Sequence, residues 1–219
     1  FNAMPHIVNE GRRVINNITA SASMYLIKTI FSVVLSIGMI LFGHGYPFKP
    51  IQLTVISACC VGIPTFFLTY EPNFKRVSGD FLKTVFKNAF PFAFMIAICS
   101  TIIVNGGRVL GLEKEMLSTI CVLLTSWCYY SGLRHIYAPL SHYRIFVIYI
   151  MQIVLYISLI VGHQFLGLGN IDYIGAITLM FLVTFSKVIY LLNFELFDIY
   201  GSVYLGEWHK KQKIDRVDY

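Results

Sequence analysis

The sequence predicts an all-α membrane protein: a six-transmembrane-helix bundle with a cytoplasmic stalk that extends the first helix. Two observations carry this prediction. Of the 219 residues, 57% are hydrophobic, and the charged residues, 13% of the chain, are confined almost entirely to the gaps between six apolar segments. Each segment approaches the ~20 residues that a helix needs to cross a hydrocarbon core of roughly 30 Å. Strands are not expected, because those of membrane barrels alternate in polarity and run only about 9 to 11 residues.

We expect the whole chain, residues 1–219, to form a single transmembrane domain. The spans follow from where charge stops and starts along the chain. They are expected at about residues 20–42, 51–70, 88–104, 116–133, 145–161 and 173–192. Gly and Pro are concentrated in the connections between these segments, where both residues favour turns.

The first helix is expected to begin before it enters the membrane. Residues 6–19 are largely polar and charged, and the stretch from Arg12 to Ala20 holds no Gly or Pro that would end a helix. Such a stalk would project by ~10 residues, and a helix that continues from water into the bilayer can transmit the movement of a soluble body. After the last span, the aromatic and basic residues 193–219 are expected to form a cytoplasmic tail.

The distribution of lysine and arginine predicts the orientation. Of the 17, twelve lie on one side of the expected spans and three on the other, while Lys28 and Lys187 lie inside spans. The positive-inside bias makes the richer side cytoplasmic, which predicts a multi-pass protein of the cell membrane with both termini in the cytoplasm. Topology, with anionic lipids as the counter-surface, accounts for the net charge of +6, so no nucleic-acid partner is expected.

Cysteine and histidine give no sign of a catalytic or zinc site. The five cysteines all lie in expected spans and none has the C-x-x-C spacing, and the six histidines are scattered without an H-E-x-x-H pair. As small polarizable side chains, the cysteines are expected to serve packing.

Five polar residues of the first span share one helical face. Ser21, Tyr25, Lys28, Ser32 and Ser36 follow one another at intervals of four, three, four and four residues. Because a buried dipole in lipid must find a partner, this face is expected to turn toward other helices or a water-filled cavity. Lys28 would cost roughly 2.5 to 3.5 kcal/mol at the centre of a span. It either reaches the interface by snorkelling or serves a function.

The second span carries a break in its middle. Pro64 has no amide hydrogen, so the carbonyl of Cys60, four residues earlier, is expected to lose its ordinary partner, and Gly62 eases the distortion. A freed carbonyl at membrane depth is tolerated where it is buried in protein or lines a cavity, where it can bind an ion. The alternative is a kink that serves packing alone.

Three motifs resemble a known family. The stretch from Glu10 to Ile18 reads E-G-R-R-V-I-N-N-I, Gly62 to Pro64 reads G-I-P, and Glu71 to Asn73 reads E-P-N. Together with the six spans, they resemble the carboxy-terminal transmembrane half of a P-type ATPase, and most closely that of the bacterial cation-translocating members. In that family a similar stalk motif opens the fifth transmembrane helix, and a similar kink marks the sixth.

The resemblance implies a pump whose phosphorylated aspartate, nucleotide site and first four spans lie upstream of Phe1. ATP and Mg²⁺ would belong to those missing cytoplasmic domains, because this chain holds no D-K-T-G-T motif, and no catalytic residue or cofactor is assigned to it. Its implied role is to form half of the ion pathway and to couple it to the phosphorylation domain. The implied partners are membrane lipids, a transported cation and the upstream half of the same pump.

The implied functional residues form two groups. The coupling stalk comprises Glu10, Arg12, Arg13, Asn16 and Asn17. The transport pathway comprises Lys28, Thr29, Ser32, Ser57, Cys60 and Pro64.

The chain also departs from the family pattern. Calcium and sodium pumps place an Asp immediately before the kink, where this chain has Val61, and no Asp or Glu lies inside the six spans. Any acidic ligands would therefore come from the missing half, and the metal stays open. Two alternatives stay open as well: a P-type ATPase that moves a lipid or another non-metal cargo, since lipid-moving members carry a fifth-helix lysine like Lys28, and a small stand-alone carrier or scaffold.

Overall fold

The computed structural model describes the backbone of residues 4–74 and 80–214, with side chains up to Asn193 except that of Pro5. These residues form helices and connecting loops without a strand. In chain order the elements are α1 (Met4–Leu41), α2 (Pro50–Ile56), the π-helix η1 (Ser57–Gly62), α3 (Ile63–Leu68), α4 (Phe81–Val109), α5 (Lys114–Ile136), α6 (His142–Val161), α7 (His163–Leu166) and α8 (Tyr173–Ile214).

The predicted fold class is confirmed. Six helical stretches within the described part of the chain are long and apolar enough to cross a membrane, counting α2, η1 and α3 as one. The observed helices extend past several predicted span limits; α4, for example, begins at Phe81 although its span was expected to begin at residue 88. Charges such as Lys83 and Lys87 mark where the apolar segment ends, but a helix continues through such residues into water.

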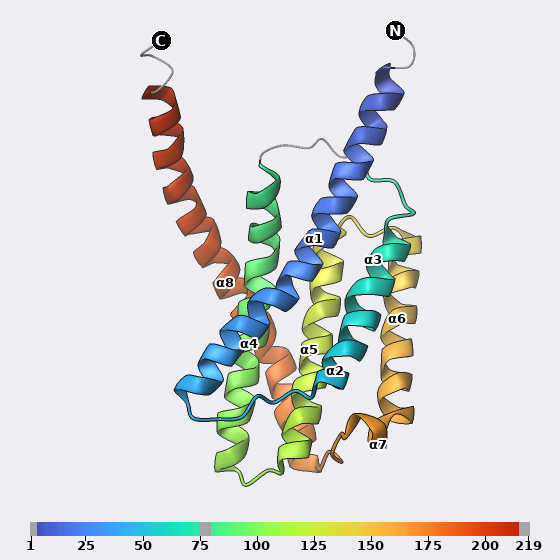
Figure 1. Ribbon diagram of the computed structural model, residues 1–219, viewed down its shortest axis with the longest axis vertical. Helices are drawn as coiled ribbons and strands as arrows, with labels where there is room; N and C mark the ends of the chain where they lie inside the picture. Colours follow the sequence, from blue (N-terminus) through green and yellow to red (C-terminus); the bar gives the residue numbers. More distant parts are fainter. Residues whose placement is uncertain (1–3, 75–79, 215–219) are drawn as a thin grey trace.

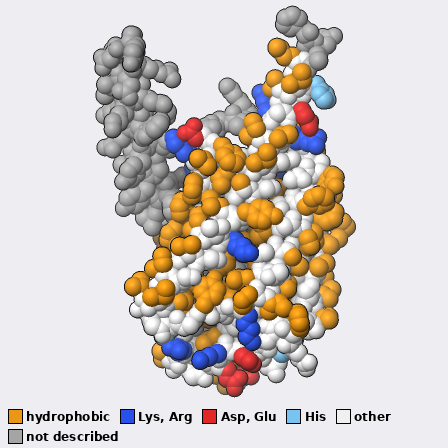
Figure 2. Space-filling view, in the orientation of Figure 1, with side chains coloured by type: hydrophobic (Ala, Val, Ile, Leu, Met, Phe, Trp, Pro, Cys, Tyr) orange, Lys and Arg blue, Asp and Glu red, His pale blue; other side chains and the backbone are white. Residues whose placement is uncertain are grey.

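The first and last helices are the longest, with 38 and 42 residues. Both extend beyond the bundle at the same end, which we call the stalk end (Figure 1). Helix α8 continues as a helix through the predicted tail as far as Ile214, although the tail's side chains and residues 215–219 lie outside the described residues. On the face drawn in Figure 2, hydrophobic side chains cover the body of the bundle, and charged side chains gather mainly at its two ends.

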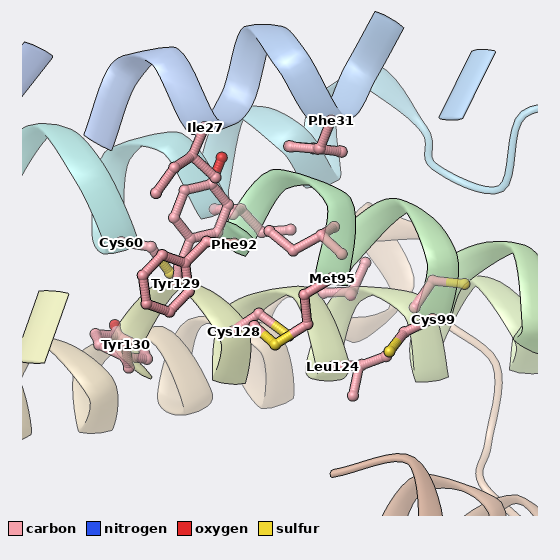
Figure 3. Packing of buried hydrophobic residues seen from close by; sticks show 14 of the residues in the cluster. Ile27, Phe31, Cys60, Phe92, Met95, Cys99, Leu124, Cys128, Tyr129 and Tyr130 are labelled. Carbon is pink, nitrogen blue, oxygen red and sulfur yellow. The ribbon is translucent and has the colours of Figure 1, made fainter. Parts of the chain in front are cut away.

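Helix α5 forms the centre of the core. It contacts α1, α2, η1, α4, α6 and α8. Tyr129 and Tyr130 are each 1% exposed, and the ring of Tyr129 lies edge-on to Phe31 of α1 with centroids 6.3 Å apart (Figure 3). Gly132 lies beside the ring of Phe92 on α4, where a Cβ would make an ordinary contact at 3.5 Å.

A buried polar network closes the bundle at the end opposite the stalk. The Gln52 side chain is fully buried, and its Oε1 accepts hydrogen bonds from the Lys49 amide at 2.9 Å and the Ser118 hydroxyl at 2.9 Å. Its Nε2 donates to the Leu166 carbonyl at 3.0 Å. A buried amide is tolerated when its hydrogen bonds are satisfied, and this one fixes α2 to α5 and α7.

Candidate functional site

The helix break predicted at Pro64 is present as a six-residue π-helix. Helix α2 ends at Ile56, η1 covers Ser57–Gly62, and the Ile63 amide donates to the carbonyl of Ala58, five residues earlier. A proline removes one amide donor, and its ring needs space in the preceding turn. Widening that turn to the π register provides the space, and such π segments are frequent at functional sites.

The widened register changes which carbonyl faces the proline. We expected Cys60, four residues before Pro64, to lose its partner; in a π register the residue opposite Pro64 is Cys59. The Tyr130 hydroxyl of α5 donates to the Cys59 carbonyl at 3.3 Å. Thr65 donates in turn to the carbonyls of Val61 at 2.7 Å and Gly62 at 3.0 Å.

Among the four carbonyls from Cys59 to Gly62, that of Cys60 has no side-chain donor in the described part of the chain. The Cys60 thiol is fully buried and hydrogen-bonds Tyr130. Ser57 is half-buried, and its hydroxyl donates to the Leu53 carbonyl of its own helix at 2.5 Å.

The predicted polar face of α1 turns inward only in part: Ser21 hydrogen-bonds Tyr137 and Ser32 hydrogen-bonds Tyr46, but the face is not buried. Apart from Ser23, whose hydroxyl donates to the Thr19 carbonyl of the same helix at 2.7 Å, the side chains that α1 buries are apolar, namely Ala20, Met24, Ile27, Phe31, Leu35 and Met39. On the predicted polar face, Tyr25 is 54% exposed, Lys28, Ser32 and Ser36 are half-buried, and the neighbouring Thr29 is exposed. The reason lies in the partner: α1 packs chiefly against α4, whose apolar side chains fit the apolar stripe.

The polar face lies at the border between α1 and η1. A Cβ at Gly62 would lie 3.8 Å from the Tyr25 hydroxyl and 3.6 Å from the Ser57 carbonyl, which places Tyr25 of α1 in contact distance of the π-helix. Lys28, one turn further along α1, has no ion pair or side-chain hydrogen bond with any described residue. The described part of the chain therefore provides no counter-ion for its ammonium group.

The stalk residues Asn16 and Asn17 bind the segment that follows α3. The Asn16 side chain donates to the Asn73 carbonyl at 2.9 Å, and the Asn17 side chain donates to the Thr69 carbonyl at 3.1 Å. Thr69 is the residue after the last one of α3, which is continuous with η1. The two asparagines thus join the stalk to the broken helix.

The other predicted stalk residues lie on the surface of α1. Arg13 and Glu10 form an ion pair at 3.2 Å across one helical turn, with both side chains more than two-fifths exposed. Arg12 is half-exposed beside them. Exposed pairs of this kind contribute little stability, typically about 0 to 1 kcal/mol.

A buried ion pair, which the sequence analysis missed, fixes the same segment to α6. Arg144 is 6% exposed in its side chain, and its Nε lies 3.1 Å from the Glu71 carboxylate. Ser141 donates to that carboxylate at 2.6 Å, and Arg144 Nη1 donates to the carbonyls of Tyr137 at 2.7 Å and Pro139 at 3.0 Å. The signal available in the sequence was that Glu71 and Arg144 border different spans on the same side.

This ion pair borders an open cavity of about 350 Å³ at the stalk end. The cavity is lined by Glu71, Pro72, Asn73, Phe74, Pro139, Leu140, Ser141 and Arg144. Within the membrane-spanning body, the described residues include no group of three His, Cys, Asp or Glu side chains arranged to hold a metal ion. The five cysteines are free and buried, as expected of packing residues.

Comparison with known proteins finds relatives of this chain among transport ATPases. It is 34% identical over 156 residues to the probable cation-transporting ATPase exp7 of Streptococcus pneumoniae, a match that covers 68% of this chain and 20% of that protein. It is 31% identical over 141 residues to the calcium-transporting ATPase CtpE of Mycobacterium tuberculosis, a match that covers 57% of this chain and 17% of that protein. The chain is a homologue of cation-transporting P-type ATPases.

This homologue spans about a fifth of the length of the curated relatives that it matches. The CtpE of Mycolicibacterium smegmatis agrees with the other relatives, at 30% identity over 137 residues. No family model matches the chain, and no solved structure matches it. The resemblance found in the stalk and the kink is thus confirmed, and the chain is a multi-pass membrane protein.

Proposed function

We propose that this chain forms the transport half of an ATP-driven cation pump. In this proposal α1 carries movement from a phosphorylation domain in the upstream half, which also supplies the sites for ATP and Mg²⁺. The stalk end lies in the cytoplasm of the cell. The observation that carries the proposal is the pair of hydrogen bonds from Asn16 and Asn17 to the segment directly after α3, because they join the stalk to the π-helix.

The ion pathway in this proposal runs along the border between α1 and η1. Thr29 and Ser32 of α1 and the Cys60 carbonyl of η1 offer oxygen ligands, with Ser57 beside them. Hard cations such as Ca²⁺ take six to eight oxygen ligands, usually including carboxylates. The spans hold no Asp or Glu, so the upstream half would supply the acids and cover the exposed polar face of α1.

Lys28 fits this scheme as a built-in counter-ion. Its ammonium group, which no described residue pairs, would occupy the acidic site supplied by the upstream half after the cation has left. An acidic pocket without cargo would otherwise hold unpaired carboxylates in a medium of low polarity.

Calcium is the first cargo to test, because two of the relatives are described as calcium-transporting. The experiment is ATPase activity of the full-length protein in Mg²⁺, with Ca²⁺, Mn²⁺, Zn²⁺ and K⁺ added one at a time. The proposal expects one cation to stimulate turnover, and expects Lys28→Ala to change the cation dependence while the protein still inserts. Turnover that ignores every added cation would reject a cation pump.

A second candidate is a pump that moves a lipid or another non-metal cargo. The unpaired charge of Lys28 beside the broken helix favours it, since a cation can bind an anionic or zwitterionic headgroup. The same assay separates the two candidates when phospholipids with different headgroups replace the added cations. Stimulation by one headgroup, with indifference to metal ions, would select the second candidate.

A further inference from the structure

Arg134 lies near the end of the membrane-spanning helix α5, and no described acidic side chain pairs with it. It lies two residues before the end of α5 at Ile136 and is half-exposed. Its guanidinium carbon lies 5.0 Å from the ring centroid of Tyr149 on α6, and its Nη2 donates to Gln152 Oε1 at 3.4 Å. No carboxylate of the described chain pairs with it, so most of its N–H donors stay available.

Arg144 shows how the same fold treats a cation that it neutralises itself. That arginine lies in the first turn of α6, at the same end of the bundle, and is buried against Glu71 and two backbone carbonyls. Arg134 instead contacts the side-chain amide of Gln152 and the ring of Tyr149. The ring of Tyr149 holds the guanidinium group by a cation–π contact without neutralising it.

A small groove lies between α5 and α6 beside Arg134. Its volume is about 150 Å³, and it is lined by Arg134, Leu140, Ile145, Ile148 and Tyr149. Both helices are long and apolar enough to span a membrane. The adjoining surface of α6 is apolar, with Phe146 61% and Ile153 56% exposed.

The groove therefore presents a cation at the end of a span and hydrocarbon walls beside it. We propose that it binds an acidic phospholipid, with the phosphate on the Arg134 guanidinium and the start of an acyl chain along Ile145. A guanidinium group matches phosphate oxygens with two parallel hydrogen bonds, which makes arginine well suited to this contact. Free phosphate would leave the isoleucine walls uncovered, and a choline headgroup would bring a second positive charge beside the first.

The experiment measures lipid retained by the full-length protein, and it does not depend on the cargo of the pump. The purified protein is loaded with phosphatidylglycerol or phosphatidylcholine and washed with detergent, and the bound lipid is counted by mass spectrometry of the intact complex. We expect retained phosphatidylglycerol and washed-out phosphatidylcholine. Arg134→Gln should weaken retention about fivefold, the effect of about 1 kcal/mol for one basic side chain at a membrane surface.

Three further variants make the test specific. Arg134→Lys should retain less lipid than the wild type but more than Arg134→Gln, because the charge remains while the two parallel hydrogen bonds are lost. Ile145→Trp should lose the lipid with the charge intact, because the indole fills the groove. Lys187→Gln is the matched control: it removes a charge of the same sign from an exposed position on α8 and should leave retention unchanged. If Arg134→Gln does not fold, the lysine and tryptophan variants carry the test.

Three results would overturn the proposal. One is equal retention of phosphatidylglycerol by the wild type and by Arg134→Gln or Ile145→Trp. Another is equal loss in Lys187→Gln, which would indicate a general effect of charge on the surrounding lipids. The third is displacement of the lipid by millimolar inorganic phosphate, which would make the groove a site for the free anion.

Discussion

The helix pair α4–α5 and the border between α1 and η1 differ in how far their side chains are buried and in whether their polar groups have partners. In the most apolar stretch of α5, 83% of the residues are buried, against 28% in that of α1. Helix α5 satisfies several of its polar side chains locally, as Ser126 does by donating to the Leu123 carbonyl at 2.7 Å. The α1–η1 border instead has a widened backbone and polar side chains, such as Lys28, without partners in the described chain.

The difference indicates that one chain provides both a complete scaffold and an incomplete surface. A scaffold needs only its own residues, which explains why α4 and α5 pack tightly. The α1–η1 border exposes polar groups that a bilayer does not satisfy, so we expect the upstream half of the proposed pump to cover it. The stalk hydrogen bonds join α1 to the segment after α3, and the Glu71–Arg144 pair joins that segment to α6.

The largest effect is expected at this joint. Arg144→Ala should lower the free energy of unfolding by about 3 to 5 kcal/mol, because it leaves the Glu71 carboxylate without its charged partner. Thermal unfolding of the purified protein measures the loss. Lys83→Ala, which breaks an exposed pair with Asp80, is the control and should cost about 1 kcal/mol or less. Equal losses would show that the buried pair is not a structural joint.

The scaffold should respond strongly to a cavity in its centre. Leu124→Ala in α5 should cost about 2 to 5 kcal/mol of stability, because Leu124 is fully buried and its neighbours can close the space only in part. Val33→Ala on the exposed side of α1 should cost about 0.5 kcal/mol or less, since Val33 is 55% exposed. The melting temperatures of the two variants compare the regions directly. A larger loss for Val33→Ala would reverse the assignment of scaffold and open surface.

The π-helix should matter for cargo more than for stability. Pro64→Ala restores an amide donor and allows η1 to return to the α register, so we expect about a tenfold loss in apparent cation affinity, equivalent to about 1.4 kcal/mol. The cation dependence of ATPase activity measures it. Pro91→Ala, at the proline inside α4, is the matched control and should leave the affinity unchanged. The same affinity for the wild type and Pro64→Ala would remove η1 from the ion pathway.

The smallest effect on stability is expected in the stalk. Asn17→Ala removes the hydrogen bond to the Thr69 carbonyl and should cost about 1 kcal/mol, yet it should lower transport per ATP hydrolysed, because the stalk then moves without α3. Thr19→Ala removes a bond to the carbonyl of Ile15 within the same helix and should leave coupling intact. Simultaneous assays of ATP hydrolysis and ion uptake in vesicles provide the comparison. Unchanged stoichiometry in Asn17→Ala would argue against coupling through this contact.

The sequence could predict the features that depend on neighbouring residues. Long apolar runs predict the six spans, a polar run before Ala20 predicts the stalk, and Pro64 predicts a broken helix, each for a local physical reason. The periodicity of α1 correctly predicts which residues share a face, but it does not predict the direction of that face. The direction depends on which helices are present to pack against it.

The features that sequence reasoning missed depend on residues far apart in the chain. Glu71 and Arg144 are separated by 73 positions in the chain. A local sequence pattern does not relate residues that far apart. Two other contacts also join residues that are distant in sequence. One is the hydrogen bond from Tyr130 to the Cys59 carbonyl, and the other is the set of hydrogen bonds that Gln52 makes with Ser118 and Leu166. Without those partners, a proline predicts a distortion but not a six-residue π-helix.

The central claim is that the stalk acts on the π-helix through Asn17. A double-mutant cycle tests it most directly, with Asn17→Ala, Pro64→Ala and the double variant compared in the cation concentration that gives half-maximal ATPase activity. The account predicts a coupling free energy of at least about 0.5 kcal/mol between the two positions, because both changes act on one mechanical connection. Effects that add within roughly 0.3 kcal/mol would contradict it, since independent sites behave in that way.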